Sequence, residues 1–126
     1  MVAGAVIDTY QLGDAVVVLP TGELDIASAP TLRDELAAVI TAQPRPRVVC
    51  CDLTDVTFMD STALSALVFA HETAAMGGQE FCLAGARASV HRVLELTQVD
   101  QVIACYDSMD AAREAILGTA GTQAES

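Results

Sequence analysis

The chain has 126 residues, of which 52% are hydrophobic, and a net charge of −11 at pH 7. This length suits one domain with one core, and so acidic a surface disfavours nucleic acid and anionic membranes, because phosphate binding requires clustered Arg or Lys. All six basic residues are Arg, and the absence of Lys excludes P-loop, Schiff-base and phospho-aspartate receiver sites. No apolar run approaches the ~18 residues that cross a bilayer, and residues 1–14 lack the basic start of a secretory signal, so we expect a cytoplasmic protein with no membrane segment.

Turn signals and apolar periodicity predict alternating strands and helices. Gly13-Asp14 is a typical hairpin turn, and Gly77-Gly78 ends a helix. Residues 48–51 form a nearly continuous apolar run, typical of a central strand that helices cover on both faces. In chain order we expect strands at 5–7 and 15–19, a helix at 29–42, a strand at 48–51, a connection at 53–59, a helix after Asp60 that ends at Met76, a strand at 81–84, a helix at 90–96, a strand at 102–105 and a helix at 109–117.

The element order ββαβαβαβα predicts an α/β sandwich whose central sheet is mixed and mostly parallel, with an antiparallel start. We expect a single domain over residues 1–117 and a flexible C-terminal tail over residues 118–126. Ser28 and Ser108 are candidate N-caps of the first and last helices. The predicted inward face of the helix after Asp60 comprises Leu64, Leu67, Val68, His71 and Ala75.

The cysteines and histidines give no metal site by their spacing. Cys50 and Cys51 point to opposite faces of one strand, and no Cys-x-x-Cys pair occurs, so we expect all four thiols, including Cys82 and Cys105, to be plain and buried. His71 is expected to be a half-buried, hydrogen-bonded residue. We predict neither a metal nor a cofactor.

Two enzymatic interpretations are weaker than their structural alternatives. Asp52 and Asp55 follow the central strand, where a magnesium site is conceivable, but solvated strand-end carboxylates explain them as well. Ser61 lacks the flanking glycines of a nucleophile elbow, and a helix would separate it from His71 by about 15 Å. We therefore expect no catalytic activity.

Asp60-Ser61-Thr62 stands where the chain enters a helix. Each of the three is a good N-cap, but one cap does not require three such residues. A serine in the first helical turn lies near free backbone N–H groups, which together with the helix dipole favour a phosphate. Ser61 is therefore either part of a cap or a phosphorylation site, and the two interpretations are compatible.

Two motifs at this spacing identify a family. Thr21-Gly22-Glu23-Leu24-Asp25 after an apolar strand, followed by Phe58-Met59-Asp60-Ser61-Thr62-Ala63-Leu64, resembles the STAS domain of bacterial anti-sigma factor antagonists. Residues 77–81 and 87–102 also fit this pattern, so the resemblance covers about residues 5–117. The chain has Ala63 where the family usually has Gly.

The resemblance implies a non-catalytic switch. The unphosphorylated protein would bind an anti-sigma factor that is also a serine kinase and so release the sigma factor. Phosphorylation of Ser61, or less favourably Thr62, would break that complex, and a metal-dependent serine phosphatase would restore it. The partner-binding residues expected from it are Asp25, Asp60, Ser61, Thr62, Ser65 and Phe69.

Other functions remain open on the sequence. A STAS module can belong to a lipid-transport complex or to a stressosome-like signalling scaffold, and a small-molecule or nucleotide sensor is a third class. Helical spacing also places Phe69 and Met76 on the face of Ser61, where they form either a docking patch or a contact with neighbouring helices.

Overall fold

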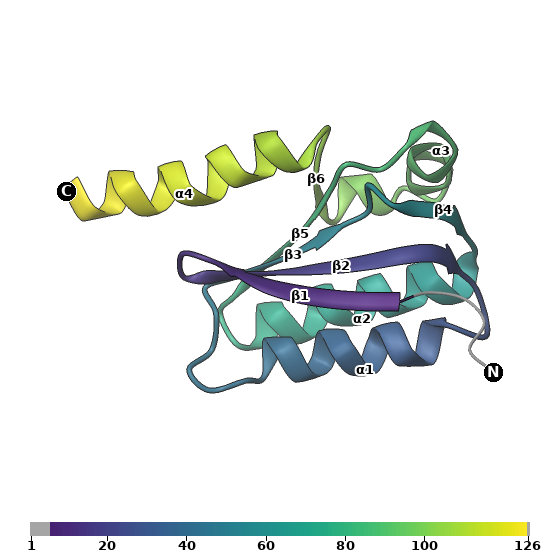
Figure 1. The fold of residues 1–126 in the computed structure, drawn as a ribbon, viewed down its shortest axis with the longest axis horizontal. Coiled ribbons are helices and arrows are strands. Elements are labelled where there is room, and N and C mark those ends of the chain that lie inside the picture. The colour runs from purple at the N-terminus through teal and green to yellow at the C-terminus, as the bar shows by residue number, and fades with distance from the viewer. Residues whose placement is uncertain (1–5, 126) are drawn as a thin grey trace.

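The computed structural model describes residues 6–125, with side chains for residues 6–118. Its elements are β1 Val6–Leu12, β2 Ala15–Leu24, α1 Ala29–Ile40, β3 Val48–Asp52, β4 Val56–Met59, α2 Ser61–Met76, β5 Glu80–Ala84, α3 Ala88–Leu96, the 3-10 helix η1 Val99–Gln101, β6 Ala104–Tyr106 and α4 Met109–Glu125. Helices α1 and α2 lie side by side beneath the sheet, and α4 lies on the opposite side and projects beyond it (Figure 1). No helix in the described part of the chain is both long and apolar enough to cross a membrane.

The sheet is mixed and mostly parallel, as predicted. Its strand order is β1-β2-β3-β5-β6, and β4 pairs with the far end of β2. Only β1 and β2 run antiparallel, joined by a turn in which Gly13 has φ +63°, a left-handed conformation that glycine adopts without a steric penalty. The predicted α/β sandwich is therefore confirmed.

Strand β4 lies where the sequence predicts only a connection. It has four residues and pairs with β2 through Glu23–Phe58 and Leu24–Met59. Its outer residues Val56 and Met59 are buried and its two middle residues are exposed, so it lacks the strict alternation that marks a strand in sequence. Tertiary pairing with β2, rather than local pattern, forms this strand.

The last helix is longer than predicted. It continues from Met109 to Glu125, past the expected end at residue 117. The expectation rested on the small, polar composition of residues 118–126, but such residues do not by themselves end a helix. The flexibility of residues 118–126 stays a prediction.

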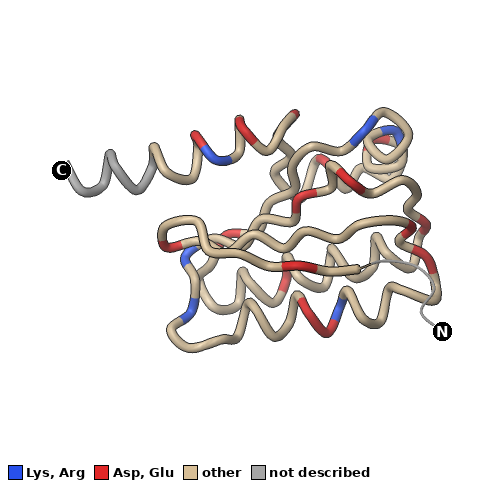
Figure 2. Tube along the Cα trace, viewed as in Figure 1, with Lys and Arg blue, Asp and Glu red and all other residues tan. Residues whose placement is uncertain are grey.

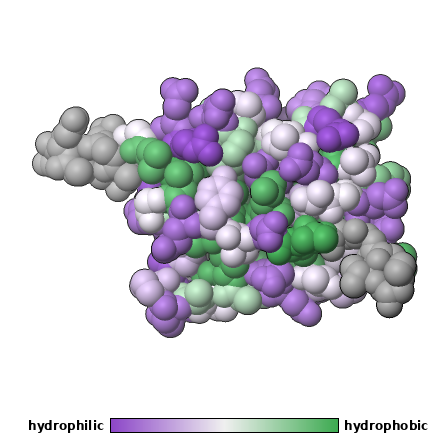
Figure 3. Space-filling view, in the orientation of Figure 1, coloured by the Kyte–Doolittle hydropathy of each residue, from purple (hydrophilic) through white to green (hydrophobic). Residues whose placement is uncertain are grey.

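The core is divided by the sheet into two clusters. The larger one packs β2, β3 and β5 against α1, α2 and α3, and includes Cys51, Leu67 and Leu94. The smaller one lies beneath α4 and joins Cys50 and Cys82 to Ile116. The prediction that Cys50 and Cys51 face opposite sides of one strand is confirmed. Apolar side chains also reach the surface of the face seen in Figure 3, where they lie among polar groups.

Helix α2 buries a broader face than predicted. Leu64 and Leu67 are buried as expected, Val68 and His71 are half-buried, and Ala75 is exposed, so its assignment to the inward face is wrong. Small residues fill the rest of the buried face because α2 packs closely against both the sheet and α1. The buried residues of α2 are Ala63, Leu64, Ala66, Leu67, Ala70 and Ala74.

The two predicted serine caps behave differently. Ser108 Oγ accepts a hydrogen bond from Ala111 N at 3.0 Å, which confirms it as the cap of α4. Ser28 occupies the N-cap position of α1, as predicted, but its side chain makes no capping hydrogen bond. Its buried hydroxyl instead donates to the carbonyl of Glu23 at 2.8 Å and accepts from Asp25 N at 3.0 Å.

Candidate functional site

Parallel pairing of β2 with β4 brings the two sequence motifs together. Leu24 and Met59 are register partners at the carboxyl ends of these strands, and Asp60 N–H donates to the Leu24 carbonyl at 3.1 Å. Asp25 and Asp60 therefore begin neighbouring connections, although 35 positions separate them in the sequence. Acidic positions gather at this end of the molecule (Figure 2).

Asp60 is the N-cap of α2. Its backbone is extended, with φ −112° and ψ −174°, and its Oδ1 accepts from Thr62 N at 2.9 Å and Ala63 N at 3.2 Å. The Thr62 hydroxyl also donates to Oδ1. These bonds, the hydroxyl of Thr62 first and the backbone N–H groups of Ala63, Thr62 and Ile26 after it, lower the pKa of Asp60.

Ser61 is the first residue of α2 and is exposed. The hydroxyl of Thr62 is committed to Asp60, and the hydroxyl of Ser65 donates to the Ser61 carbonyl at 3.1 Å. Asp60 is thus the cap, and Thr62 supports it by donating to its carboxylate. Ser61 is the one of the three residues whose hydroxyl is left exposed. This division resolves why the sequence carries three potential caps.

The same geometry corrects one expectation about phosphate. The backbone N–H groups of the first helical turn were expected to be free to hold a phosphate on Ser61, but those of Thr62 and Ala63 already donate to the Asp60 carboxylate. The next N–H group, that of Leu64, donates to the Asp60 carbonyl at 3.1 Å. A phosphate on Ser61 would therefore meet an occupied helix N-terminus with a carboxylate beside it, which is an electrostatic conflict.

Asp25 fixes its own connection. Its Oδ1 accepts from Ala27 N at 3.0 Å and Ser28 N at 3.2 Å, and the buried Ser28 hydroxyl closes the same turn. The conformation presents Ile26 to solvent with 75% of its surface exposed. These contacts show that the Asp25 side chain holds the connection that carries Ile26.

An apolar groove lies beside Ser61, between the first turns of α1 and α2. It has a volume of about 270 Å³, and its lining includes the predicted partner-binding residues Thr62 and Ser65 as well as Ile26 and Arg33. Sequence reasoning missed Ile26 and Arg33. Ile26 stands alone in the short connection between β2 and α1, and a single aliphatic residue at such a position is common on protein surfaces, so its type alone did not mark it.

Phe69 and Met76 do not form one docking patch. The ring of Phe69 is half-buried, and the guanidinium carbon of Arg33 lies 3.9 Å from its centroid, so α1 covers it in part. Met76 is 88% exposed, but 15 residues of helix place it about 22 Å from Ser61 along the axis. Of the two possibilities, Phe69 fits the interhelical contact and Met76 lies outside the Ser61 region.

The other candidate polar residues serve the fold. Asp52 is buried and its Oδ1 accepts from Thr54 N at 3.0 Å and Thr54 Oγ1 at 2.6 Å, so it closes a turn and is not a solvated carboxylate. His71 is half-buried as expected, but its buried Nδ1 has no hydrogen-bond partner among the residues that the structure describes. In the described residues no three His, Cys, Asp or Glu side chains gather as a metal site.

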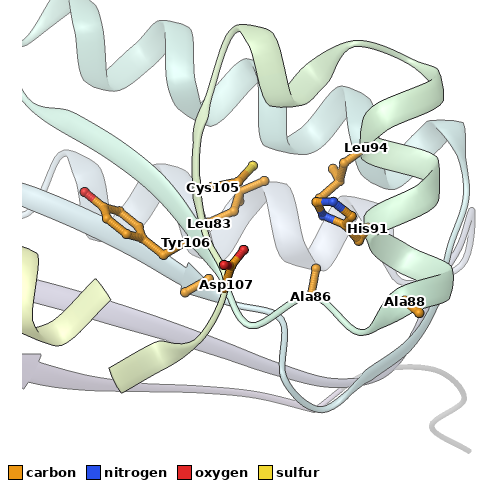
Figure 4. A pocket seen from close by; sticks show the side chains of 9 residues that line it. Leu83, Ala86, Ala88, His91, Leu94, Cys105, Tyr106 and Asp107 are labelled. Carbon is orange, nitrogen blue, oxygen red and sulfur yellow. The ribbon is translucent and has the colours of Figure 1, made fainter. Parts of the chain in front are cut away.

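A second cavity lies at the carboxyl ends of β5 and β6. Its volume is about 190 Å³, and His91 of α3 lies across it from Asp107, Cys105 and Leu83 (Figure 4). The His91 ring is also 3.5 Å from the Glu95 carboxylate. The volume is below the ~300 Å³ at which ordinary ligand pockets begin, and the carboxylates beside it disfavour phosphate groups.

Comparison with known proteins assigns the family. The STAS domain family model matches residues 6–112. An anti-sigma factor antagonist of Thermotoga maritima, so named provisionally, is 27% identical over 103 residues, which are 82% of this chain and 90% of that protein.

Solved structures agree. An anti-sigma factor antagonist from Mycobacterium paratuberculosis superposes with a TM-score of 0.80 at 26% identity, covering 89% of this chain and 93% of that one. The unphosphorylated form of the anti-sigma factor antagonist SpoIIAA shares the fold, with a TM-score of 0.75 at 15% identity over 90% of this chain and 97% of that one. This chain belongs to the STAS domain family and resembles its anti-sigma factor antagonists.

Proposed function

We propose that this protein is an anti-sigma factor antagonist controlled by phosphorylation of Ser61. In its unphosphorylated form it binds an anti-sigma factor with serine kinase activity and frees the sigma factor. Phosphorylation of Ser61 ends the binding, and a metal-dependent serine phosphatase restores it. The protein itself catalyses nothing, acts in the cytoplasm and needs no cofactor.

The observation that carries the proposal is the arrangement at the start of α2. Ser61 is exposed, while its two polar neighbours are committed to the cap. A kinase can therefore reach the Ser61 hydroxyl without unfolding the helix. Thr62 is the less favourable target, because its hydroxyl would first have to leave the Asp60 carboxylate.

Electrostatics supports loss of binding after phosphorylation. A phosphate adds about −1.5 to −2 charges, next to Asp60 and near the Asp25 connection. In a docked interface these charges would be partly removed from water and would repel one another, which is costly at short range. The groove lined by Ile26 and Thr62 lies directly beside this position, so the repulsion acts where a partner would contact apolar surface.

The proposal is tested by phosphorylation in vitro. The protein is incubated with ATP and each anti-sigma kinase encoded in the same genome, and the modified residue is mapped by mass spectrometry. We expect modification of Ser61 in the wild type and in Thr62→Val, and none in Ser61→Ala. Equal modification of Ser61→Ala, or modification only at Thr62, would overturn the assignment.

The alternative functions make a different prediction. A transport or scaffold module would bind its partner independently of the charge at position 61, whereas the proposed switch depends on it. The cavity between α3 and β6, at about 190 Å³, gives a nucleotide sensor little support. Binding that survives Ser61→Asp unchanged would favour a module of another system.

A further inference from the structure

The sheet places two of the cysteines side by side beneath α4. Cys50 of β3 and Cys82 of β5 are register partners on adjacent parallel strands, so their side chains point to the same face. Both belong to the small core cluster that α4 covers, and both are free thiols. This pairing was not predictable from the spacing of the two cysteines, because 31 residues lie between them.

The two thiols interact and titrate as a pair, so one proton leaves the pair more readily than the other. The side-chain interaction with Cys82, and after it burial, raises the pKa of Cys50. The interaction with Cys50 lowers the pKa of Cys82, although burial of Cys82 opposes this effect. Cys82 is therefore the thiol of this pair that more readily forms the nucleophilic thiolate.

Cys82 also has a route to small solutes. A cavity of about 60 Å³ opens between α4 and the β5–β6 edge and is lined by Cys82, Tyr106 and Ile116. This volume exceeds the 10–15 Å³ or so that one water molecule requires. Hydrogen peroxide, which is little larger than water, fits such a space, whereas bulky thiol reagents do not.

We propose that Cys50 and Cys82 form a reversible disulfide when hydrogen peroxide enters this cavity and oxidises Cys82. The site goes beyond the proposed function and does not depend on it. The Cα atoms of neighbouring strands lie about 4.8 Å apart, within the 4.4–6.8 Å or so that disulfides span. Their Cβ atoms must approach to about 3.5–4.5 Å, so the bond draws β3 and β5 together and is readily reduced.

Hydrogen peroxide is the only reactant needed to convert the two thiols into a disulfide and two water molecules. The Cys82 thiolate, its proton released to water, attacks one peroxide oxygen; the O–O bond breaks, giving a sulfenic acid and hydroxide. That hydroxide takes the Cys50 proton and becomes water. The Cys50 thiolate then attacks the Cys82 sulfur, the S–O bond breaks, and the departing hydroxide recovers the first proton as the second water.

The remaining cysteines provide matched controls. Cys51 is fully buried on the opposite face of β3, and burial raises its pKa. Cys105 is half-buried at the other cavity, and burial raises its pKa to about 11. Neither shares a register position with another cysteine, so serine at either position leaves the proposed disulfide intact.

The test treats the folded full-length protein with hydrogen peroxide, removes the peroxide, and then unfolds the protein so that the remaining thiols can be blocked. Cleavage before aspartate separates the peptides 34–51, 60–99 and 100–106. We expect a cross-link between 34–51 and 60–99 that dithiothreitol reverses, with Cys51→Ser and Cys105→Ser behaving like the wild type. Cys50→Ser should instead accumulate sulfenic acid at Cys82, and Cys82→Ser should lower the oxidation of Cys50 by about tenfold or more.

Three results would overturn the proposal. They are a cross-link that persists in Cys50→Ser, oxidation of Cys51 or Cys105 as fast as that of Cys82, and a cross-link that forms only in denaturant. Circular dichroism of each variant before oxidation identifies any that fails to fold, and Cys50→Ala and Cys82→Ala then replace the serine variants.

Discussion

At the scale of single residues, the start of α2 separates two tasks that the sequence leaves together. The Asp60 carboxylate accepts hydrogen bonds from the N–H groups of Thr62 and Ala63 and from the Thr62 hydroxyl. Ser61 takes no part in these bonds and is exposed. A capping motif was predictable from residue types alone. Which of the three residues caps was not, because that choice depends on the extended backbone at Asp60, which pairing of β4 with β2 fixes.

The lowered pKa of Asp60 makes a pH-dependent prediction. The pKa of Asp60 is lower in the folded protein than its unfolded value of about 3.9, so the ionised carboxylate stabilises the fold. This stabilisation is complete at pH values above the unfolded pKa and is lost as the pH falls through the folded pKa. Asp60→Asn, which keeps an acceptor but not the charge, should therefore be less stable than the wild type at neutral pH, and the difference should narrow near about pH 3.

Urea unfolding at the two pH values measures this difference. Asp60→Ala should lose more stability than Asp60→Asn, since it also loses the acceptor. Ser61→Ala is the matched control, because its exposed hydroxyl supports nothing, and it should stay within about 0.5 kcal/mol of the wild type. A gap between Asp60→Asn and the wild type that does not change with pH would contradict the account.

Arg33 and Phe69 make a second prediction at this scale. The guanidinium lies 3.9 Å from the ring centroid and joins α1 to α2. Arg33→Gln should lower the free energy of unfolding by about 0.5–1 kcal/mol, and a double-mutant cycle with Phe69→Leu should return a coupling of the same size. Arg92→Gln, at an exposed position of α3, serves as the control, and a coupling near zero would show that the contact contributes nothing.

At the scale of elements, the connections decide where the site residues lie. Most strands and helices follow from local patterns of apolar residues, and the sequence predicts them. Strand β4 and the groove between α1 and α2 do not, because they form only when distant segments pack. Ile26 and Arg33 were missed for this reason: their importance depends on the neighbouring helix, which periodicity within one segment cannot reveal.

Two glycines with the same backbone angle provide a test of the β5–α3 connection. Gly78 and Gly85 both have φ +72°, but a Cβ at Gly78 meets open space, whereas a Cβ at Gly85 would collide with Thr54 Oγ1 beside the buried Asp52. Gly78→Ala should cost about 1–2 kcal/mol for the left-handed backbone. Gly85→Ala should cost about 1–3 kcal/mol more, because the Asp52–Thr54 turn must move.

The free energy of unfolding of both variants in urea measures the difference. Equal losses in Gly78→Ala and Gly85→Ala would mean that the Asp52–Thr54 turn yields without cost. In that case Asp52 would not be the rigid strand-end group that its hydrogen bonds to Thr54 indicate.

At the scale of the whole molecule, the mixed sheet, the order of its main elements and the STAS family were all predictable from the sequence. The two motifs lie far apart along the chain, and the fold brings them to one end through the β2–β4 pair. The sequence did not reveal whether the backbone N–H groups at the start of α2 are free or hydrogen-bonded. These N–H groups are occupied by Asp60, so a phosphate on Ser61 adds repulsion to an acidic end of the molecule (Figure 2).

The most direct measurement is the affinity of the unphosphorylated protein for its anti-sigma kinase, compared with that of the Ser61-phosphorylated protein and of Ser61→Asp. Ser61→Ala is the uncharged control. The account predicts that wild type and Ser61→Ala bind alike, and that both negatively charged forms bind at least about tenfold more weakly, equivalent to about 1.4 kcal/mol. Equal affinity of all four forms would contradict the central claim that charge at Ser61 is the switch.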